Sequence, residues 1–380
     1  MRKTSIELLV DECDSTQKEE KEDGLEMRKC TQTGKTIRTL LIALLLCSLL
    51  LCSGGCAQQT KLTHLVGISL PSTSDSSRWV RDGKVLQDAV EALGCPTELC
   101  YASNSVQRQQ QQLNQLLDDG ARLLIIAAVD ATALNEVLER AEANDVPVIA
   151  YEQLLMGNQT VDYYIGADNF MAGRLQAQYI INALEQNCGR PMLVEMFVGP
   201  ATDVDARSIY AGMREIFMPY IASGELQMKS GETNFEQVCI TGDSRESAQE
   251  RMSRLIADVY DGGRPDAVVV PCDKAAMGVL DALQSAGVTE LPLIAGQQGT
   301  KESVQAGHQS VALLTNAREL AQSASEIVWE LLCGDHLMVE ATVNNGAADI
   351  PALLLTPQLV DRSDCCQMMA NSGAVPAELP

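Results

Sequence analysis

The chain has 380 residues, and its 28 Lys and Arg against 51 Asp and Glu leave a formal net charge of −23 at pH 7. That balance excludes nucleic acid as the expected partner and disfavours docking on anionic lipid, because both interactions need a basic face. Hydrophobic residues make up 46% of the chain, enough to bury a core over most of it, and the length predicts two domains or one domain with additions. We expect neither a metal nor a cofactor, since the three histidines are far apart in the sequence: His64, His308 and His336.

The first part of the chain has the pattern of an export signal. Residues 39–52 form an apolar run, TLLIALLLCSLLLC, that is too short to span a bilayer and suits the core of a secretory signal peptide. Four cationic residues precede the run and SGGCA follows it, which resembles a bacterial lipobox. This pattern predicts a lipoprotein signal peptide over 27–55 and diacylation of Cys56, which would anchor the protein stably to the membrane. Plain cleavage and free secretion is the alternative.

Residues 1–26 are acidic and polar, and they precede a complete signal that starts at Met27. We interpret them as the result of a start codon assigned too early, with a disordered cytoplasmic tail as the alternative. Residues 56–62 are expected to link the lipidated Cys to the folded part. The cysteine spacing indicates no zinc site, and two disulfides stay open as alternatives to free thiols: Cys95 with Cys100 and Cys365 with Cys366.

From residue 64 onward, short apolar runs alternate with longer amphipathic stretches. The apolar runs predict strands at 64–70, 123–129, 146–151, 163–167, 192–199, 267–271, 291–296 and 310–314. The amphipathic stretches predict helices at 83–94, 106–120, 131–145, 170–186, 246–262, 274–287 and 317–334. Continuously apolar strands that alternate with helices are typical of parallel sheets covered on both faces. Because the strands are too many for one small sheet, we expect an α/β chain with two doubly wound lobes.

Ligands of doubly wound sheets bind beyond the carboxyl ends of the strands. Six polar residues follow predicted strands at that edge: Arg78, Glu152, Asp168, Asp203, Asp273 and Gln298. No G-x-G-x-x-G sequence follows the first strand, and no G-x-S-x-G or other nucleophile context occurs. The sequence therefore predicts binding without covalent chemistry, and no enzyme.

Several segments together carry a resemblance to a known family: SRWVRDG (77–83), PVIAYE (147–152), VDYYIGADNFMAG (161–173), ARSIYAGM (206–213), PDAVVVPCDKAAMG (265–278), LPLIAGQ (291–297) and NNGAADIPALLLTP (344–357). Over about residues 63–362 the chain resembles the xylose-binding and multiple-sugar-binding branch of the periplasmic substrate-binding proteins of ABC transporters. The resemblance implies two Rossmann-like lobes with parallel central sheets, joined by a three-crossing hinge. A sugar would bind in the cleft between them, and lobe closure would signal to a membrane permease.

The resemblance also implies where the chain passes between the lobes, near 168–170, 313–317 and 348–352. We therefore expect an N-terminal lobe of 63–168 and 315–350, a C-terminal lobe of 169–314 and 351–362, and a tail of 363–380. Asp168 and Asn169 are expected to shape the hinge.

Part of the ligand pocket carries over by resemblance. Arg78 matches a residue that donates to sugar hydroxyls or the ring oxygen, and Trp79 matches an aromatic that packs on a sugar face. Asp203 matches a carboxylate that accepts from hydroxyls, and Asp205 stands where Asn is usual. Pairing with Asp82 is the alternative for Arg78, and packing in the core is the alternative for Trp79.

Other positions depart from the family pattern, and we include them in the predicted pocket. Glu152 and Gln153 replace an Asp-Arg pair, and Cys272 replaces an Asn beside the retained Asp273. Gln298 replaces an Asp, Thr315 replaces a Lys, and the stacking Trp of the second lobe has no counterpart at 239–244. A pocket that hydrogen-bonds one pattern of hydroxyls discriminates strongly against others, so we expect a ligand that differs from xylose.

The leading hypothesis is a monomeric, lipid-anchored, extracytoplasmic protein that captures a pentose or hexose by lobe closure and delivers it to an ABC permease. It would contact the membrane only through its lipid. One alternative is a sugar sensor that signals to a chemoreceptor or histidine kinase, and another is a relative whose ligand has diverged.

Overall fold

The computed structural model describes residues 64–73, 78–184, 190–242, 244–297, 301–333, 339, 341–361 and 364. Cys56, the signal segment and the tail cysteines Cys365 and Cys366 lie outside these residues. Within them, Cys95 and Cys100 are both free thiols. None of the helices in these ranges combines the length and the apolar character that crossing a membrane requires.

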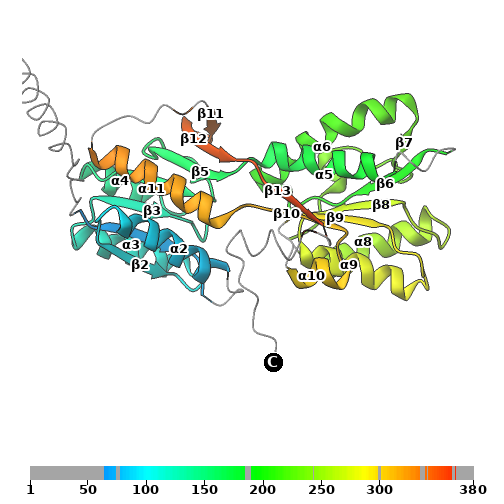
Figure 1. Cartoon of the computed structure of the whole chain (residues 1–380), viewed down its shortest axis with the longest axis horizontal. Helices are drawn as coiled ribbons and strands as arrows, with labels where there is room; N and C mark the ends of the chain where they lie inside the picture. Colours follow the sequence, from blue (N-terminus) through cyan, green and yellow to red (C-terminus); the bar gives the residue numbers. More distant parts are fainter. Residues whose placement is uncertain are drawn as a thin grey trace, which may run out of the picture. The chain divides into compact units, whose positions relative to one another are not determined.

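The strands form two sheets, both mostly parallel (Figure 1). The first sheet has the order β11-β12-β5-β4-β3-β1-β2. Its strands are β1 (Val66–Leu70), β2 (Thr97–Tyr101), β3 (Leu123–Ile126), β4 (Val148–Tyr151), β5 (Tyr163–Ala167), β11 (Ala341–Asn344) and β12 (Asp349–Leu355). The second sheet has the order β13-β10-β9-β8-β6-β7. Its strands are β6 (Met192–Met196), β7 (Leu226–Gln227), β8 (Ala267–Val270), β9 (Leu293–Gln297), β10 (Val311–Leu314) and β13 (Gln358–Asp361).

Helices cover both faces of the first sheet, and the alternation of buried side chains along β3 shows how. Leu123 and Ile125 pack on one face in a cluster with α2 and α11, whereas Leu124 and Ile126 pack on the other face with α3 and α4. Successive side chains of a strand point to opposite faces, so a continuously apolar strand needs a helix layer on each side. These helices are α2 (Arg78–Ala92), α3 (Val106–Asp118), α4 (Asn135–Ala143) and α11 (Ala317–Cys333).

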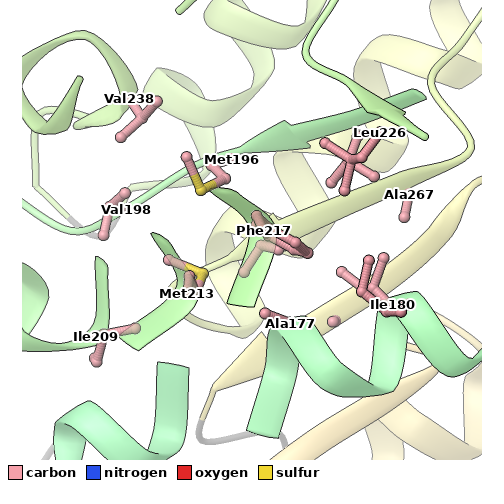
Figure 2. Close-up of a cluster of buried hydrophobic side chains, with 14 of the residues drawn as sticks. Ala177, Ile180, Met196, Val198, Ile209, Met213, Phe217, Leu226, Val238 and Ala267 are labelled. Carbon is pink, nitrogen blue, oxygen red and sulfur yellow. The ribbon is translucent and has the colours of Figure 1, made fainter. Parts of the chain in front are cut away.

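The second sheet is built in the same way. On one face Met196 and Val269 pack against α5 and α6, and on the other Val268 and Val270 pack against α8 and α9. In Figure 2 the Phe217 ring of α6 lies in the middle of the first of these clusters, between Met196 and the α5 residues Ala177 and Ile180. The helices of this part are α5 (Asn169–Leu184), α6 (Val204–Ser223), α7 (Phe235–Val238), α8 (Arg245–Asp258), α9 (Asp273–Ser285) and α10 (Lys301–Ala306). The predicted architecture of two doubly wound α/β sheets is therefore confirmed.

Between residues 64 and 361 the chain passes from one sheet to the other three times: from β5 into α5, from β10 into α11, and from β12 into β13. The third passage differs from the expected 348–352. Strand β12 continues to Leu355 and pairs with β5 from Ala352↔Tyr164 to Leu355↔Ala167, so the passage is at 356–357. Residues 351–355 therefore belong to the first sheet and not, as expected, to the second lobe. Each sheet also gains one antiparallel pair, β11 with β12 and β10 with β13.

Candidate functional site

A cavity of about 120 Å³ lies at the carboxyl ends of β6 and β8. Four segments line it: two residues of α5, the residues that follow β6, the first turns of α6, and the end of β8 with the two residues after it. The lining residues are Asn169, Gln176, Phe197, Val198, Gly199, Asp203, Asp205, Ala206, Ile209, Met213, Val269, Val270, Pro271 and Cys272. This is the edge of the sheet at which the sequence predicts a ligand.

Two carboxylates lie at the start of α6. Asp203 is the N-cap: its backbone is extended (φ −87°, ψ 120°), and its side chain accepts a hydrogen bond from the backbone N–H of Asp205 at 2.9 Å. Asp203 is exposed, and Asp205, in the first turn, is half-buried. The N-terminus of a helix favours negative charge, so the helix itself helps to hold this pair at the cavity.

The carboxyl group of Asp205 has a raised pKa. Burial and, to a smaller extent, the negative charge of Asp203 raise its pKa from the ordinary value of 3.8 to about 6, while a hydrogen bond with the side chain of Asn169 opposes the rise. The group therefore changes charge close to neutral pH. Below its pKa it can donate a hydrogen bond, and above it can only accept.

Asp168 and Asn169 mark the first passage between the sheets. The Asp168 carboxylate accepts from the backbone N–H of Met171 at 2.8 Å, which caps α5. The Asp168 backbone N–H donates to the carbonyl of Leu355 at 2.8 Å, next to the third passage. Asp168 thus joins two of the three connecting segments, and Asn169, one residue on, reaches the cavity.

Cys272 and Asp273 follow β8 at the start of α9. Cys272 lines the cavity, and its carbonyl accepts from the backbone N–H of Ala276 at 3.0 Å. The Asp273 carboxylate accepts from the side-chain amide of the buried Gln309 at 2.6 Å and does not belong to the lining.

Glu152 and Gln153 follow β4 in a sharp turn. Glu152 has a left-handed backbone (φ 59°), which is uncommon for a residue with a side chain. Its N–H donates to the Ile165 carbonyl at 2.7 Å, and the Tyr164 hydroxyl donates to its carbonyl at 3.4 Å. Burial raises the pKa of Tyr164, and the charges of Asp205 and Asp203 raise it further. Tyr164 therefore contacts the turn after β4 and also senses the electrostatic potential of the two carboxylates.

Trp79, Gln153 and Thr315 do not line the cavity. Trp79 is half-buried and packs against the core of the first sheet, and Thr315 is half-buried after β10. Gln153 is exposed. Gln298 and the side chain of Arg78 lie outside the described residues. The structure thus brings four of the predicted residues to one cavity, namely Asn169, Asp203, Asp205 and Cys272.

Two polar or aromatic lining residues were missed by the sequence analysis, Phe197 and Gln176. Phe197 lies inside the predicted strand 192–199, so the rule that selects residues after strand ends passes over it; β6 in fact ends at Met196, one residue earlier. Gln176 lies within α5, where only its spacing from Asn169 could have indicated it. Among the described residues no group of three or more His, Cys, Asp or Glu is placed to hold a metal ion. The site offers two carboxylates, two side-chain amides and apolar surface, which suits a neutral, hydroxyl-rich ligand.

Comparison with known proteins gives consistent matches over most of the chain. The model of the periplasmic binding protein domain matches residues 66–336. The chain is 35% identical over 317 residues to the multiple sugar-binding periplasmic protein SbpA of Azospirillum brasilense, which covers 81% of this chain and 88% of that protein. It is 33% identical over 323 residues to the multiple sugar-binding periplasmic receptor ChvE of Rhizobium radiobacter, covering 82% of this chain and 91% of that one.

A solved structure agrees with these matches. The crystal structure of an ABC transporter solute binding protein from Clostridium phytofermentans with bound β-D-glucose superimposes with a TM-score of 0.73 and 34% sequence identity. The match covers 83% of this chain and 99% of that one. The resemblance to the multiple-sugar-binding proteins is therefore confirmed over the two sheets and their helices.

Proposed function

Because the chain belongs to the periplasmic binding protein family, we propose that it captures a monosaccharide outside the cytoplasm and delivers it to the permease of an ABC transporter. The observation that carries the proposal is the cavity beside Asp203 and Asp205 at the carboxyl ends of β6 and β8. Sugars present several hydroxyls on an apolar ring, and carboxylates and amides next to apolar side chains satisfy both. Two relatives are described as multiple sugar-binding and a third has glucose bound, which supports a monosaccharide of the pentose or hexose class.

The proposed pocket includes the residues that the sequence selects around this cavity. Asp203 and Asp205 would accept hydrogen bonds from hydroxyls, with Asn169 positioning Asp205. The contribution of the first sheet would come from Arg78, Trp79 and the turn at Glu152 and Gln153, and the remaining contacts from Cys272, Asp273, Gln298 and Thr315. We further propose that the protein is a monomer and that lipid on Cys56 holds it at the membrane. The mass of the N-terminal peptide of the exported protein would show whether Cys56 carries the lipid.

The test measures the binding of a panel of small molecules to the purified protein. The monosaccharides are D-glucose, D-galactose, D-xylose and L-arabinose, and the non-sugars are myo-inositol, adenosine and two amino acids. We expect one or more monosaccharides to raise the melting temperature, because a ligand at 100 times its Kd stabilises the folded state by about 2.7 kcal/mol. The non-sugars should leave it unchanged. A panel in which only non-sugars stabilise the protein would contradict the proposal.

One observation favours a second function. The relative ChvE is described as a receptor, and it aligns with 82% of this chain. The sugar-bound form of this protein would then present its surface to a signalling protein, a chemoreceptor or a histidine kinase, in place of or besides a permease. Cross-linking of the sugar-loaded protein in membranes, followed by identification of the captured chain, distinguishes a permease from a sensor.

A further inference from the structure

The base of the cavity holds a polar side chain that has no hydrogen-bond partner among the described residues. Gln176 is 1% exposed, and neither its Oε1 nor its Nε2 bonds to any described residue. A buried amide that has lost its water carries a free-energy penalty unless another group satisfies it. Gln176 lines the cavity, so a partner can reach it only from there.

Three elements show that the cavity runs inward from the mouth to Gln176. On α5, Gln176 comes seven residues after Asn169, which is two helical turns or about 10 Å along the same face. On α6, Asp205 lies at the outer end, while Met213, eight residues on, is fully buried. On β8 the lining passes from the buried Val269 to the half-buried Cys272. The carboxylates are therefore at the mouth and the amide is at the base.

Close contact between α5 and α6 fixes the position of Gln176. A Cβ on Gly173, one turn before Gln176, would lie 1.9 Å from the carbonyl oxygen of Ile209. A Cβ on Gly212 would lie 2.0 Å from the carbonyl oxygen of Phe170. Backbone touches backbone at both points, so the helix that carries Gln176 has little freedom to turn the amide away from the cavity.

The size of the cavity limits what can reach the amide. Its volume of about 120 Å³ is smaller than the roughly 150 Å³ of a protein cavity known to hold benzene, so it admits a part of a sugar rather than a whole ring. A hydroxymethyl group fits this space, since it is short and slightly apolar at carbon. Ile209, Met213 and Val269 supply apolar walls for its carbon. Its hydroxyl matches an amide, because both groups donate and accept hydrogen bonds.

We propose that Gln176 determines specificity by hydrogen-bonding the exocyclic hydroxymethyl group of a hexose whose ring is held at the mouth. The inference rests on the proposed function and adds to it the choice between hexose and pentose. A pentose lacks this group and leaves the amide unsatisfied, and a site built around a hydrogen bond rejects the analogue that lacks it. Ordered water on Gln176 that stays in place when sugar binds is the competing occupant.

The experiment compares two sugars that differ only in this group, D-glucose and D-xylose, by titration calorimetry. Gln176→Met keeps the length of the side chain and removes both polar atoms. We expect it to weaken D-glucose binding by about tenfold or more, while D-xylose binding changes less than about twofold. The melting temperature of the sugar-free protein should stay the same or rise, because an unsatisfied buried amide has been removed.

The matched control is Gln178→Met, which places the same change on the exposed face of α5, where Gln178 donates to Asn182 at 2.8 Å. It should leave both affinities unchanged. Gln176→Asn, which keeps the chemistry with a shorter reach, should give an intermediate loss for D-glucose and serves if the Met variant does not fold. Equal effects on the two sugars, or none on D-glucose, overturn the inference and point to bound water. If the wild-type protein binds neither sugar, the result overturns this inference together with the proposal that the ligand is a pentose or hexose.

Discussion

At the residue scale, the chemistry of the site depends on how two carboxylates share the start of α6. Asp203 is exposed and bonds to the backbone of Asp205, and Asp205 is half-buried behind it. The folded pKa of Asp205 is about 6, above its ordinary value of 3.8, because burial and the charge of Asp203 disfavour its ionised form. Folding therefore favours the protonated form. This group's contribution to stability is fully present below about pH 4 and is lost as pH rises through about 6.

We predict that sugar affinity rises with pH, whereas the contribution of Asp205 to stability falls. An ionised carboxylate accepts a hydrogen bond from a hydroxyl more strongly than a carboxylic acid does, so binding should favour ionised Asp205. Affinity for a neutral monosaccharide should rise several-fold between about pH 5 and about pH 7.5, centred near the pKa of about 6. Calorimetry over this range measures the slope. Asp205→Asn should bind more weakly and lose the slope, and an unchanged slope in that variant would assign the pH dependence to another group.

At the element scale, α5 and α6 can pack at backbone contact only because glycine occupies both crossing points. On helix propensity alone, Gly212→Ala should stabilise the protein by about 1 kcal/mol. We predict the reverse, a loss of about 1–3 kcal/mol, because the new methyl group would meet the Phe170 carbonyl and force the helices apart. Thermal or urea unfolding measures the difference. Ala211→Ser, on the exposed neighbouring position, should change stability by less than about 0.5 kcal/mol, and a stabilised Gly212→Ala variant would refute the close contact.

Element patterns also explain which parts of the fold could be predicted. Fully buried strands such as β3 and β8 are apolar at every position, so they were found. Strand β2 was missed because it is the half-buried edge of its sheet and reads TELCY. Helix α6 was missed because Pro219 lies inside it and apolar residues such as Val204 are on its exposed side. The third passage differs from the prediction because the resemblance puts it near 348–352, whereas β12 continues its pairing with β5 as far as Leu355.

The rule that ligands bind beyond strand ends also found part of the site. Residues that follow parallel strands gather at one edge of their sheet whatever their spacing in the chain, which is why Asp203, Asp205 and Cys272 meet after β6 and β8. Asn169 follows β5 of the first sheet and reaches the cavity because it begins α5, which packs on the second sheet. Gln176 follows no strand. Its proposed role depends on burial without a hydrogen-bond partner in the described part of the chain, and a glutamine on a helix gives no sign of that until α6 and β8 are packed against it.

At the scale of the whole molecule, the charge of −23 bears on which sugars the protein can bind. A sugar acid or sugar phosphate would approach a strongly acidic protein and then meet Asp203 and Asp205 at the cavity. Two like charges about 8 Å apart repel by about 2 kcal/mol at an effective dielectric constant of about 20, which is more than a tenfold loss of affinity for each carboxylate met. The binding site should therefore select neutral monosaccharides.

We predict that D-glucuronate and glucose 6-phosphate bind at least about tenfold more weakly than D-glucose at neutral pH and low salt. D-glucuronamide, which has nearly the same shape as glucuronate without the charge, is the matched probe and should bind more tightly than the acid. Raising the salt concentration from about 20 mM to about 300 mM should reduce the difference in affinity between glucuronate and glucuronamide, because salt screens exposed charge. The affinity for D-glucose should stay unchanged. Equal affinity for glucuronate and glucuronamide would indicate a cation at the ligand, for which Arg78 is the first residue to substitute.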